Sequence, residues 1–373
     1  MLQTSRIIAR NGITRESRIR GTLVGAVIGD SLGSIHDTLP HSYAETASRA
    51  DPLSLRAKLV RSGDQYIFRF SADSFTLFNA TESLLMCPPS RLAEHFLTSL
   101  VQTYSTRGLN KSIPTSQVLS SLKQASSLKL SNNCVLPRAI ACGLIDPALA
   151  PVLAGTTHAH VQAKESSLVL AKIIDRIWRA VKNEDVTQQL NDALKEHESL
   201  NKKYKILQDI LKYNSEDEEE TIYLQEEFRK RIGVSTAASV SLMAGLFGLM
   251  KAEQIQKKLN ASDINATIAK MPAHIVALRG SERSKNILGN SNRLDAAKAF
   301  EREDAVLMDD KEFVMAVNWV LGLGGDVRTN GMVAGAIAGA RWGVEGIPDE
   351  WKKYCEGVEK AEELAEMIIA KLK

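Results

Sequence analysis

Residues 333–340 read Val-Ala-Gly-Ala-Ile-Ala-Gly-Ala, and they follow the polar stretch Gly-Gly-Asp-Val-Arg-Thr at residues 324–329. A run of small apolar residues that is rich in alanine and free of charge predicts a buried helix that a neighbour can approach closely. A similar pattern lies near the start of the chain, where glycine recurs every four residues at 21, 25 and 29. That spacing places the glycines on one face of a helix. The sequence therefore predicts two central, buried helices at 21–33 and 332–342, and Asp30 is expected to end the apolar part of the first.

Composition and periodicity predict an all-α fold. Of the 373 residues, 44% are hydrophobic but only 5% are aromatic, which favours packed helices over a β-sandwich. Almost no stretch alternates as a strand does, and we expect about a dozen helices or more in one domain, residues 18–372. The clearest helical stretches are 74–86, 91–104, 138–153, 163–181, 233–250, 312–323 and 330–344. No run of about 18 uncharged apolar residues occurs, so no membrane span is expected.

The charge of the chain is concentrated at its N-terminus. The net charge is +3, and residues 1–20 contribute five arginines against one glutamate, so the remainder sums to −1. The chain therefore has no broad basic surface of the kind that binds nucleic acid. Residues 1–17 form a basic extension whose composition is typical of a mitochondrial transit peptide, which predicts the mitochondrial matrix. The alternative is a basic first helix that belongs to the fold of a cytoplasmic protein. The four cysteines have no CxxC spacing and are expected to be free thiols in a reducing compartment.

Two polar segments interrupt the apolar helices. Residues 183–231 are dense in charge, with heptad-like apolar spacing from Leu190 to Leu211 and an acidic run at 216–220. Residues 251–311 are polar, contain Pro272, Gly280 and Gly289, and are interpreted as an insertion. Additions of this kind either form a surface for a partner or are tolerated surface loops, and both interpretations stay open.

Several motifs together resemble the ADP-ribosylglycohydrolase family, most closely the ADP-ribosylhydrolase-3-like branch; some lens crystallins are similar to the same family. They are the Gly-xxx-Gly-xxx-Gly-Asp-xx-Gly pattern at 21–33, the Gly-Gly-Asp-x-x-Thr pattern at 324–329, the Ile-Pro-Asp-Glu-Trp run at 347–351 and the Trp-xxx-Cys-Glu-Gly run at 351–357. The resemblance implies a compact orthogonal bundle of α-helices. It also implies hydrolysis of the bond that joins ADP-ribose to an amino-acid side chain, with two Mg²⁺ ions held by hard oxygen ligands.

The metal motifs of that family are incomplete in this chain. The usual Thr-Asp-Asp-Thr cluster is replaced by Ser71-Ala72-Asp73-Ser74, and the usual Asp-x-Asp-Thr cluster by Asp326-Val327-Arg328-Thr329. Ala72 offers no ligand, and Arg328 places a fixed cation where a carboxylate belongs. The resemblance leaves vestigial metal ligands at Ser71, Asp73, Asp326 and Thr329, and a vestigial position for a catalytic glutamate of a mobile loop at Asp37.

The ligand-binding motifs are altered as well. The family's Asn-Gly-Gly loop corresponds to Asn133-Cys134-Val135, so the backbone can approach a pyrophosphate less closely. His158 stands where the family often contacts the adenosine ribose. The resemblance therefore gives Asn133 and His158 as the remaining candidates for an ADP-ribose-type ligand.

The charge of the site favours one of two possible functions. Two carboxylates and one guanidinium sum to −1, which cannot balance the +4 of two Mg²⁺ ions. We expect no metal cofactor and an inactive family member that serves as a structural or interaction subunit with protein partners. The alternative is a weakened Mg²⁺-dependent hydrolase or a binder of an ADP-ribose-type ligand. Asp73 and Asp326 are expected to meet in one cleft with Arg328 as their internal counter-ion, unless Arg328 points to solvent from a loop.

Overall fold

The computed structural model describes residues 12–37, 60–62, 65–106, 131–180, 186–212, 219–261 and 312–373. The helices in the first half are α2 (Arg15–Asp37), α4 (Ala72–Met86), α5 (Pro89–Thr106), α7 (Leu136–Ile145), α8 (Ala150–Gly155) and α9 (Val161–Arg179). Those in the second half are α10 (Val186–Leu194), α11 (Glu198–Ile210), α12 (Glu219–Arg231), α13 (Ala238–Ala261), α18 (Glu312–Leu321), α19 (Val327–Trp342), α20 (Asp349–Tyr354) and α21 (Val358–Leu372). Short 3₁₀ turns lie at Asn133–Val135, Pro147–Leu149 and Val344–Gly346.

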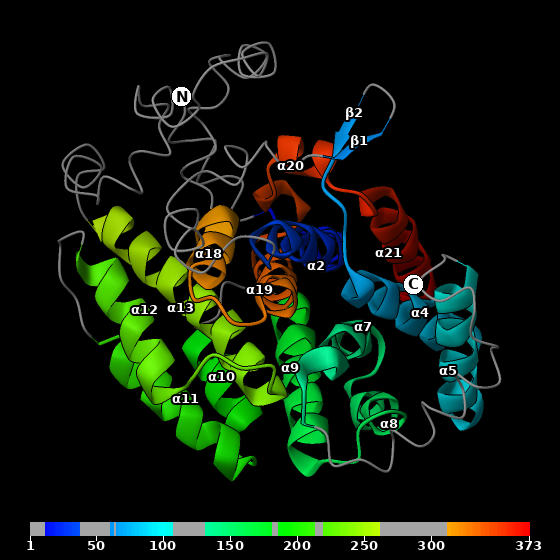
Figure 1. Cartoon of the computed structure of the whole chain (residues 1–373), viewed down its shortest axis with the longest axis horizontal. Coiled ribbons are helices and arrows are strands. Elements are labelled where there is room, and N and C mark those ends of the chain that lie inside the picture. The colour runs from blue at the N-terminus through cyan, green and yellow to red at the C-terminus, as the bar shows by residue number, and fades with distance from the viewer. Residues whose placement is uncertain are drawn as a thin grey trace.

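The predicted all-α class is confirmed. The only strands in the described ranges are β1 (Val60–Ser62) and β2 (Gln65–Ile67), which pair antiparallel as a small hairpin at the surface. The hairpin stands beside α20, away from the helical core (Figure 1). None of the helices in these ranges is long and apolar enough to cross a bilayer.

Helices α2 and α19 run antiparallel through the centre of the molecule (Figure 1). Their glycines face one another, because a Cβ atom added at Gly29 would lie 2.0 Å from the carbonyl oxygen of Gly331. A Cβ added at Gly335 would likewise lie 2.0 Å from the carbonyl oxygen of Gly25. Only glycine permits this approach of two backbones, so the prediction of two central buried helices is confirmed.

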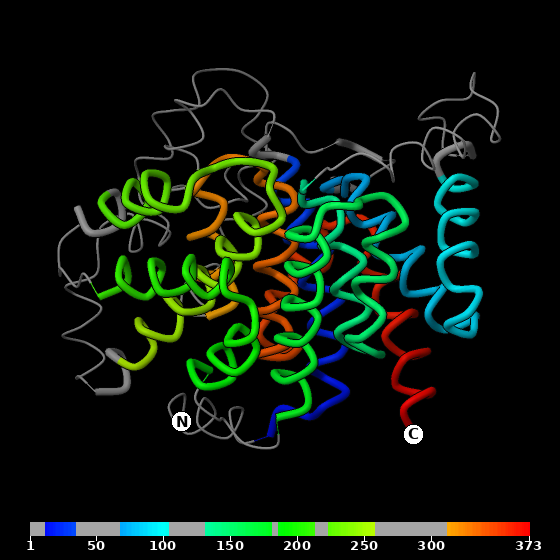
Figure 2. The backbone as a smooth tube through the Cα atoms, turned by 90° about the horizontal axis from the view of Figure 1, so that it is seen from below, coloured from blue at the N-terminus to red at the C-terminus, as the bar shows by residue number. Residues whose placement is uncertain are grey.

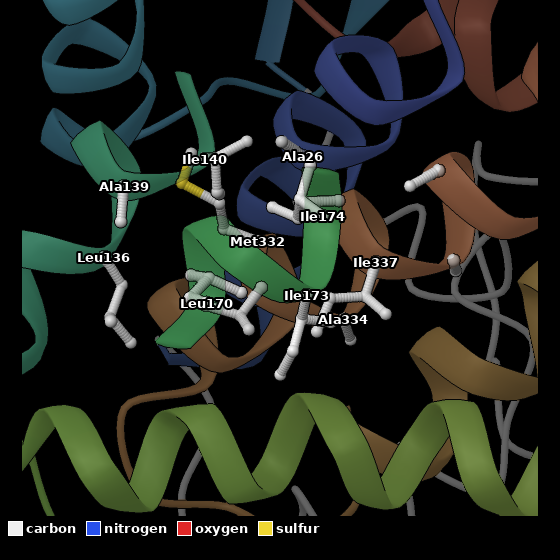
Figure 3. Close-up of a cluster of buried hydrophobic side chains, with 14 of the residues drawn as sticks. Ala26, Leu136, Ala139, Ile140, Leu170, Ile173, Ile174, Met332, Ala334 and Ile337 are labelled. Carbon is white, nitrogen blue, oxygen red and sulfur yellow. The ribbon is translucent and has the colours of Figure 1, made fainter. Parts of the chain in front are cut away.

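Two flanks enclose this central pair. Helices α10 to α13 lie on one side and α4, α5 and α21 on the other, while α7 and α9 pack beneath the pair (Figures 1 and 2). The core is made where four helices meet, by Ala26 of α2, Ile140 of α7, Ile174 of α9 and Met332 of α19 (Figure 3). All four side chains are fully buried. Helices α4 and α19, whose N-termini carry the predicted site residues, both pack on this core.

Three boundaries expected from the sequence differ in the structure. The single helix expected at 138–153 is two helices, because Asp146 caps the turn through the amide of Ala148 and Pro147 lacks an N–H for a continuing helix. Asp30 does not end its helix, since α2 continues to Asp37. The basic extension was expected to reach residue 17, but α2 begins at Arg15 and Ser17 is buried.

The two polar segments differ in how they fold. In the described part of the charged segment, the apolar positions of α10, α11 and α12 are buried against α9 and α13, as the heptad-like spacing predicts. Helix α13 extends to Ala261 instead of ending near residue 250, and Lys251 and Ala252 are buried. The rest of the predicted insertion, 262–311, lies outside the described residues, as do residues 1–11 and most of the acidic run.

Candidate functional site

The N-terminus of α4 carries the first group of predicted site residues. Ser71 is the N-cap, and its hydroxyl accepts a hydrogen bond of 3.1 Å from the amide of Asp73. The carboxylate of Asp30 reaches this turn from α2, and its Oδ2 accepts from the Ser71 amide at 2.8 Å and the Ser74 hydroxyl at 2.6 Å. A carboxylate at a helix N-terminus is favoured by the helix dipole. Asp30 therefore fastens the start of α4 to the central helix.

The second group lies at the start of α19. Gly324 and Gly325 both have positive φ angles, of 76° and 73°, and they form the turn that aims Asp326. Asp326 is the N-cap of α19, where its Oδ1 accepts from the amide of Thr329 at 3.5 Å. Its Oδ2 accepts from the side-chain amide of Asn133 at 3.1 Å. The consecutive left-handed residues explain why glycine is required at these two positions.

The structure brings the two groups together. The hydroxyl of Thr329 donates a hydrogen bond of 2.5 Å to Oδ2 of Asp73. The negative charge of Asp326 also raises the pKa of Asp73, so the two carboxylates interact. We call Ser71, Asp73, Asp326, Arg328 and Thr329 the aspartate cluster.

The electrostatics of the cluster centre on Asp73. Burial and then the neighbouring charge of Asp30 raise the pKa of Asp73 to about 7. The Thr329 hydrogen bond and the charge of Arg328 oppose this rise but do not cancel it. Burial also raises the pKa of Asp30, against the hydrogen bonds from Ser71 and Ser74 that lower it. Asp73 and the adjoining Asp30 thus resist full ionisation.

Arg328 lies in the first turn of α19, half-buried, and not in a loop. Its Cα packs against α2, where a Cβ added at Gly33 would lie 2.6 Å away. Because its charge lowers the pKa of Asp73, the guanidinium acts on the cluster electrostatically. The alternative placed Arg328 in a loop, and that placement is wrong because the residue lies in α19. Its role as a counter-ion of the aspartates stays a prediction.

Asn133 stands between the cluster and α13. Its buried side-chain amide donates to Asp326 and, at 2.8 Å, to the hydroxyl of Ser241. Its backbone amide donates to the carbonyl of Thr236 at 2.7 Å, which pins the loop to the segment before α13. Its Oδ1 has no hydrogen-bond partner although it is buried. Asn133 is thus part of the site and has an acceptor to offer.

His158 is buried beside the same loop. One ring nitrogen, Nε2, bonds Oδ1 of Asn132, and the other, Nδ1, bonds the hydroxyl of Thr157 at 2.7 Å. Burial and then the charge of Arg138 lower the pKa of His158 to about 4, so the ring is neutral at pH 7. His158 therefore holds the loop that carries Asn133 through Nε2, while Nδ1 is bonded by the neighbouring Thr157.

The remaining candidates are placed as follows. Asp37 is the last residue of α2, and its side chain lies outside what the structure describes. Cys134 is exposed as a residue, but its sulfur is partly shielded from water, and this desolvation and then the charge of Asp73 raise the pKa of the thiol to about 11. A thiol with that pKa is protonated at pH 7 and is a poor nucleophile. His160, expected at a helix start, is the N-cap of α9 through its Nδ1.

Sequence reasoning missed three residues that build the site. Asp30 could have been recognised as an acid within an apolar helix, a position that requires a buried partner. Arg138 is 2% exposed and donates to the carbonyls of Leu153 and Cys134. Ser241 gives no signal in the sequence, because a serine in a small-residue helix is ordinary.

The sequence pattern of the ADP-ribosylglycohydrolase family matches residues 11–373. The chain belongs to that family. The matched range includes α4 and α19, the two helices whose N-termini carry the aspartate cluster. It confirms the resemblance that the motifs indicated.

Individual relatives match only a short part of this family member. ADP-ribosylhydrolase ARH3 of Danio rerio is 46% identical over 52 residues, 14% of each chain. The proteins of the same name from Bos taurus and Homo sapiens are 46% and 44% identical over 48 residues, 13% of each chain. This chain therefore matches about one seventh of the length of these curated relatives. A solved structure described as "ADP-ribosylglycohydrolase-related protein complex" is 18% identical, with a TM-score of 0.54 over 96% of this chain and 99% of the other, which shows a shared fold.

The donor set can be compared with the two Mg²⁺ ions that the family resemblance implies. Hard oxygen ligands are needed, and the cluster has two carboxylates, Asp73 and Asp326, next to the cation of Arg328. The hydroxyls of Ser71 and Thr329 bond the amide and the carboxylate of Asp73 and keep oxygen lone pairs, but they are neutral and do not offset the charge of Arg328. Within the described ranges, no group of three or more His, Cys, Asp and Glu side chains is arranged to hold a metal ion. These residues do not fit a pair of divalent cations.

Proposed function

We propose that this member of the ADP-ribosylglycohydrolase family is catalytically inactive and acts as a structural or interaction subunit. The observation that carries the proposal is the position of Arg328. It occupies the first turn of α19, two residues after Asp326, and its charge acts on Asp73. A guanidinium there repels a divalent cation and supplies no oxygen ligand.

Hydrogen bonds within the chain support this proposal, because they hold the cluster together. Thr329 bonds Asp73, Asn133 bonds Asp326, and Asp30 fastens the start of α4. Each carboxylate therefore has a donor within the chain, and a hydrogen-bonded carboxylate needs less external charge. This supports a scaffold in which hydrogen bonds within the chain hold the aspartates of the former metal centre.

The charged layer of α10, α11 and α12 is the proposed partner surface. Its helices bury their apolar sides against α9 and α13 and carry ion pairs on the outside, such as Arg231 with Asp209 at 3.3 Å. The Arg-rich start of the chain supports a mitochondrial location for the complex, with the cytoplasm as the alternative.

A second candidate function is the binding of an ADP-ribose-type ligand. It is favoured by Oδ1 of Asn133, an acceptor that is buried without a hydrogen-bond partner next to Asp326. A buried acceptor of this kind costs free energy unless another group donates to it. A ligand hydroxyl is one such donor.

Three measurements on the purified chain test these proposals. Release of ADP-ribose from modified serine or arginine peptides should not exceed background, with or without Mg²⁺. Mg²⁺-dependent turnover that disappears in Asp326→Ala would overturn the inactive reading and establish the weakened hydrolase. Calorimetric titration with ADP-ribose decides the second candidate: binding that is lost in Asn133→Ala supports it, and no heat contradicts it.

The subunit role is tested separately, by tagging the chain at its C-terminus in its native cell. Mitochondrial fractionation followed by size-exclusion chromatography should show the chain in a particle larger than its 40.9 kDa monomer. Charge-reversing changes on the outer face of α11 and α12 should return it to monomer size. A chain that elutes as a monomer from all fractions contradicts the subunit role.

A further inference from the structure

The turn that precedes Asp326 is hydrogen-bonded by a residue of the charged layer, which consists of α10, α11 and α12. Residues Gly322 to Asp326 connect the end of α18 to the start of α19. Arg229, in the last turn of α12, donates from Nη2 to the carbonyl of Gly322 at 2.8 Å and from Nε to the carbonyl of Leu323 at 3.0 Å. The planar fork of an arginine suits two successive carbonyls, and a cation is favoured at the C-terminal end of a helix such as α18.

The next carbonyl of the same turn is held from the other side. The side-chain amide of Asn330, in α19, donates to the carbonyl of Gly324 at 3.1 Å. Val234, which follows α12, packs on the turn, because a Cβ added at Gly325 would lie 3.3 Å from its Cβ. Two glycines with positive φ leave this turn little intrinsic stiffness, so its position depends on these outside contacts.

Arg229 is itself firmly placed by its neighbours. Phe228, the preceding residue, is buried and packs on Phe247 of α13 with ring centroids 5.4 Å apart. Arg231, two residues on, is directed away from the turn and pairs with Asp209 of α11. Arg229 thus links α12 to the turn, whereas the ion pair of Arg231 lies within the charged layer.

We propose that Arg229 is a positioning residue that couples α12 to the Gly322–Asp326 turn and so sets where the Asp326 carboxylate stands in the aspartate cluster. The charged segment would then serve as a brace on the site, and a partner that displaced α12 would move Asp326. This inference does not depend on whether the cluster is catalytically active, because it concerns only the position of Asp326.

The amide of Thr329 and the side-chain amide of Asn133 are suitable reporters, because both bond the Asp326 carboxylate. In Arg229→Met, hydrogen exchange at the Thr329 amide should become about tenfold faster, as expected for the loss of roughly one charge-assisted hydrogen bond. The Asn133 side-chain amide resonances should shift at the same time. Arg229→Lys keeps the charge but not the fork, and should give a smaller change in both.

Arg231→Met is the matched control, since it removes an arginine from the same helix turn without touching the turn at 322–326. It should leave both reporters unchanged, and exchange at Ile174 in α9 should be unchanged in every variant. Unaltered reporters in Arg229→Met, or equal changes in Arg231→Met, would overturn the proposal. So would faster exchange of similar size throughout α9 and α19, because that indicates a general loss of stability. If Arg229→Met does not fold, Arg229→Lys is compared with Arg231→Met instead. Faster exchange at the Thr329 amide in Arg229→Lys than in Arg231→Met supports the proposal, and equal exchange overturns it.

Discussion

The hydroxyl of Thr329 donates a hydrogen bond of 2.5 Å to Asp73, across 256 positions of sequence. The bond joins the first turn of α19 to the first turn of α4, and the Asp326 carboxylate interacts with Asp73 at the same point. Two helix N-termini that converge on carboxylates form a favourable arrangement even without a metal. The hydrogen bonds and helix dipoles at this point therefore stabilise the cluster by themselves.

The raised pKa of Asp73 predicts a dependence of stability on pH. In the folded chain Asp73 has a pKa of about 7, whereas in the unfolded chain it ionises near pH 4. The folded chain then binds more protons between these values, so the free energy of unfolding should fall as pH rises from about 4 to about 7 and then level off. Asp30, whose pKa is also raised, contributes in the same direction.

Asp73→Asn removes this contribution while keeping an acceptor for Thr329. Urea unfolding at several pH values should give a flatter curve for the variant than for the wild type. Asp209→Asn is the control, because Lys212 and then Arg231 hold the pKa of Asp209 below its usual range, so this carboxylate cannot cause stability to fall as pH rises. Parallel curves for wild type and Asp73→Asn would contradict the raised pKa of Asp73.

Restoring the missing carboxylates should restore binding of Mg²⁺. In the double variant Ala72→Asp with Arg328→Asp, the charge of the cluster changes from −1 to −4, enough to balance two divalent ions. Calorimetry should detect Mg²⁺ binding to the double variant and not to the wild type. At free Mg²⁺ about 100 times the Kd, binding stabilises the fold by about 2.7 kcal/mol, which thermal unfolding would also report.

Arg328→Gln separates the effect of removing the cation from the effect of adding carboxylate ligands. It removes the cation without adding a ligand, so it should bind Mg²⁺ more weakly than the double variant. It should also be less stable than the wild type if Arg328 is the internal counter-ion of the cluster. A variant as stable as the wild type would show that the guanidinium does not neutralise the aspartates.

The contact between α2 and α19 should not tolerate a methyl group. In Gly335→Ala the new Cβ would lie 2.0 Å from the carbonyl oxygen of Gly25, and the two backbones must separate. The expected loss of stability is about 1–3 kcal/mol or more. Gly155→Ala is the control, because its nearest neighbour is the flexible Lys164 side chain at 3.4 Å, and the change should stay within about 0.5 kcal/mol. Chemical denaturation measures both, and equal stabilities would contradict the packing.

Arg138 should prove essential to the loop that carries Asn133. It is 2% exposed and donates to the carbonyls of Leu153 and Cys134 and to the hydroxyl of Thr156. Arg138→Met removes these three hydrogen bonds, although the Leu153 carbonyl still accepts from the Thr156 hydroxyl, at an expected cost of about 2–4 kcal/mol in urea unfolding.

The same substitution should change the titration of His158. The charge of Arg138 is the second cause, after burial, that lowers the pKa of His158 to about 4. Without that charge, NMR titration should give a higher pKa, still below the ordinary value because the ring stays buried. Arg176→Met, which removes an exposed arginine paired with Asp192 at 3.6 Å, should change neither property.

Helix positions could be predicted where the pattern is local. The small-residue patterns located α2 and α19, and the predicted stretches 74–86 and 91–104 correctly separated α4 from α5, because Pro88 and Pro89 lie between them and such signals act within a few residues. The break between α7 and α8 was missed although Pro147 is visible, because the apolar run on both sides outweighed the cap of Asp146. The length of α13 was missed because Lys251 is buried against expectation, beside the ring of Trp319.

The sequence alone determined the helical class, the family and the two positions, Ala72 and Arg328, where the expected carboxylates are absent. These are properties of residue identity and short-range spacing. Only the tertiary structure decided which groups share a site: Asp30 with Ser74, Thr329 with Asp73, Asn133 with Asp326, and Arg229 with the turn before α19. The partner of a buried polar group is chosen by the packing of whole helices, and that packing depends on contacts between residues far apart in the chain.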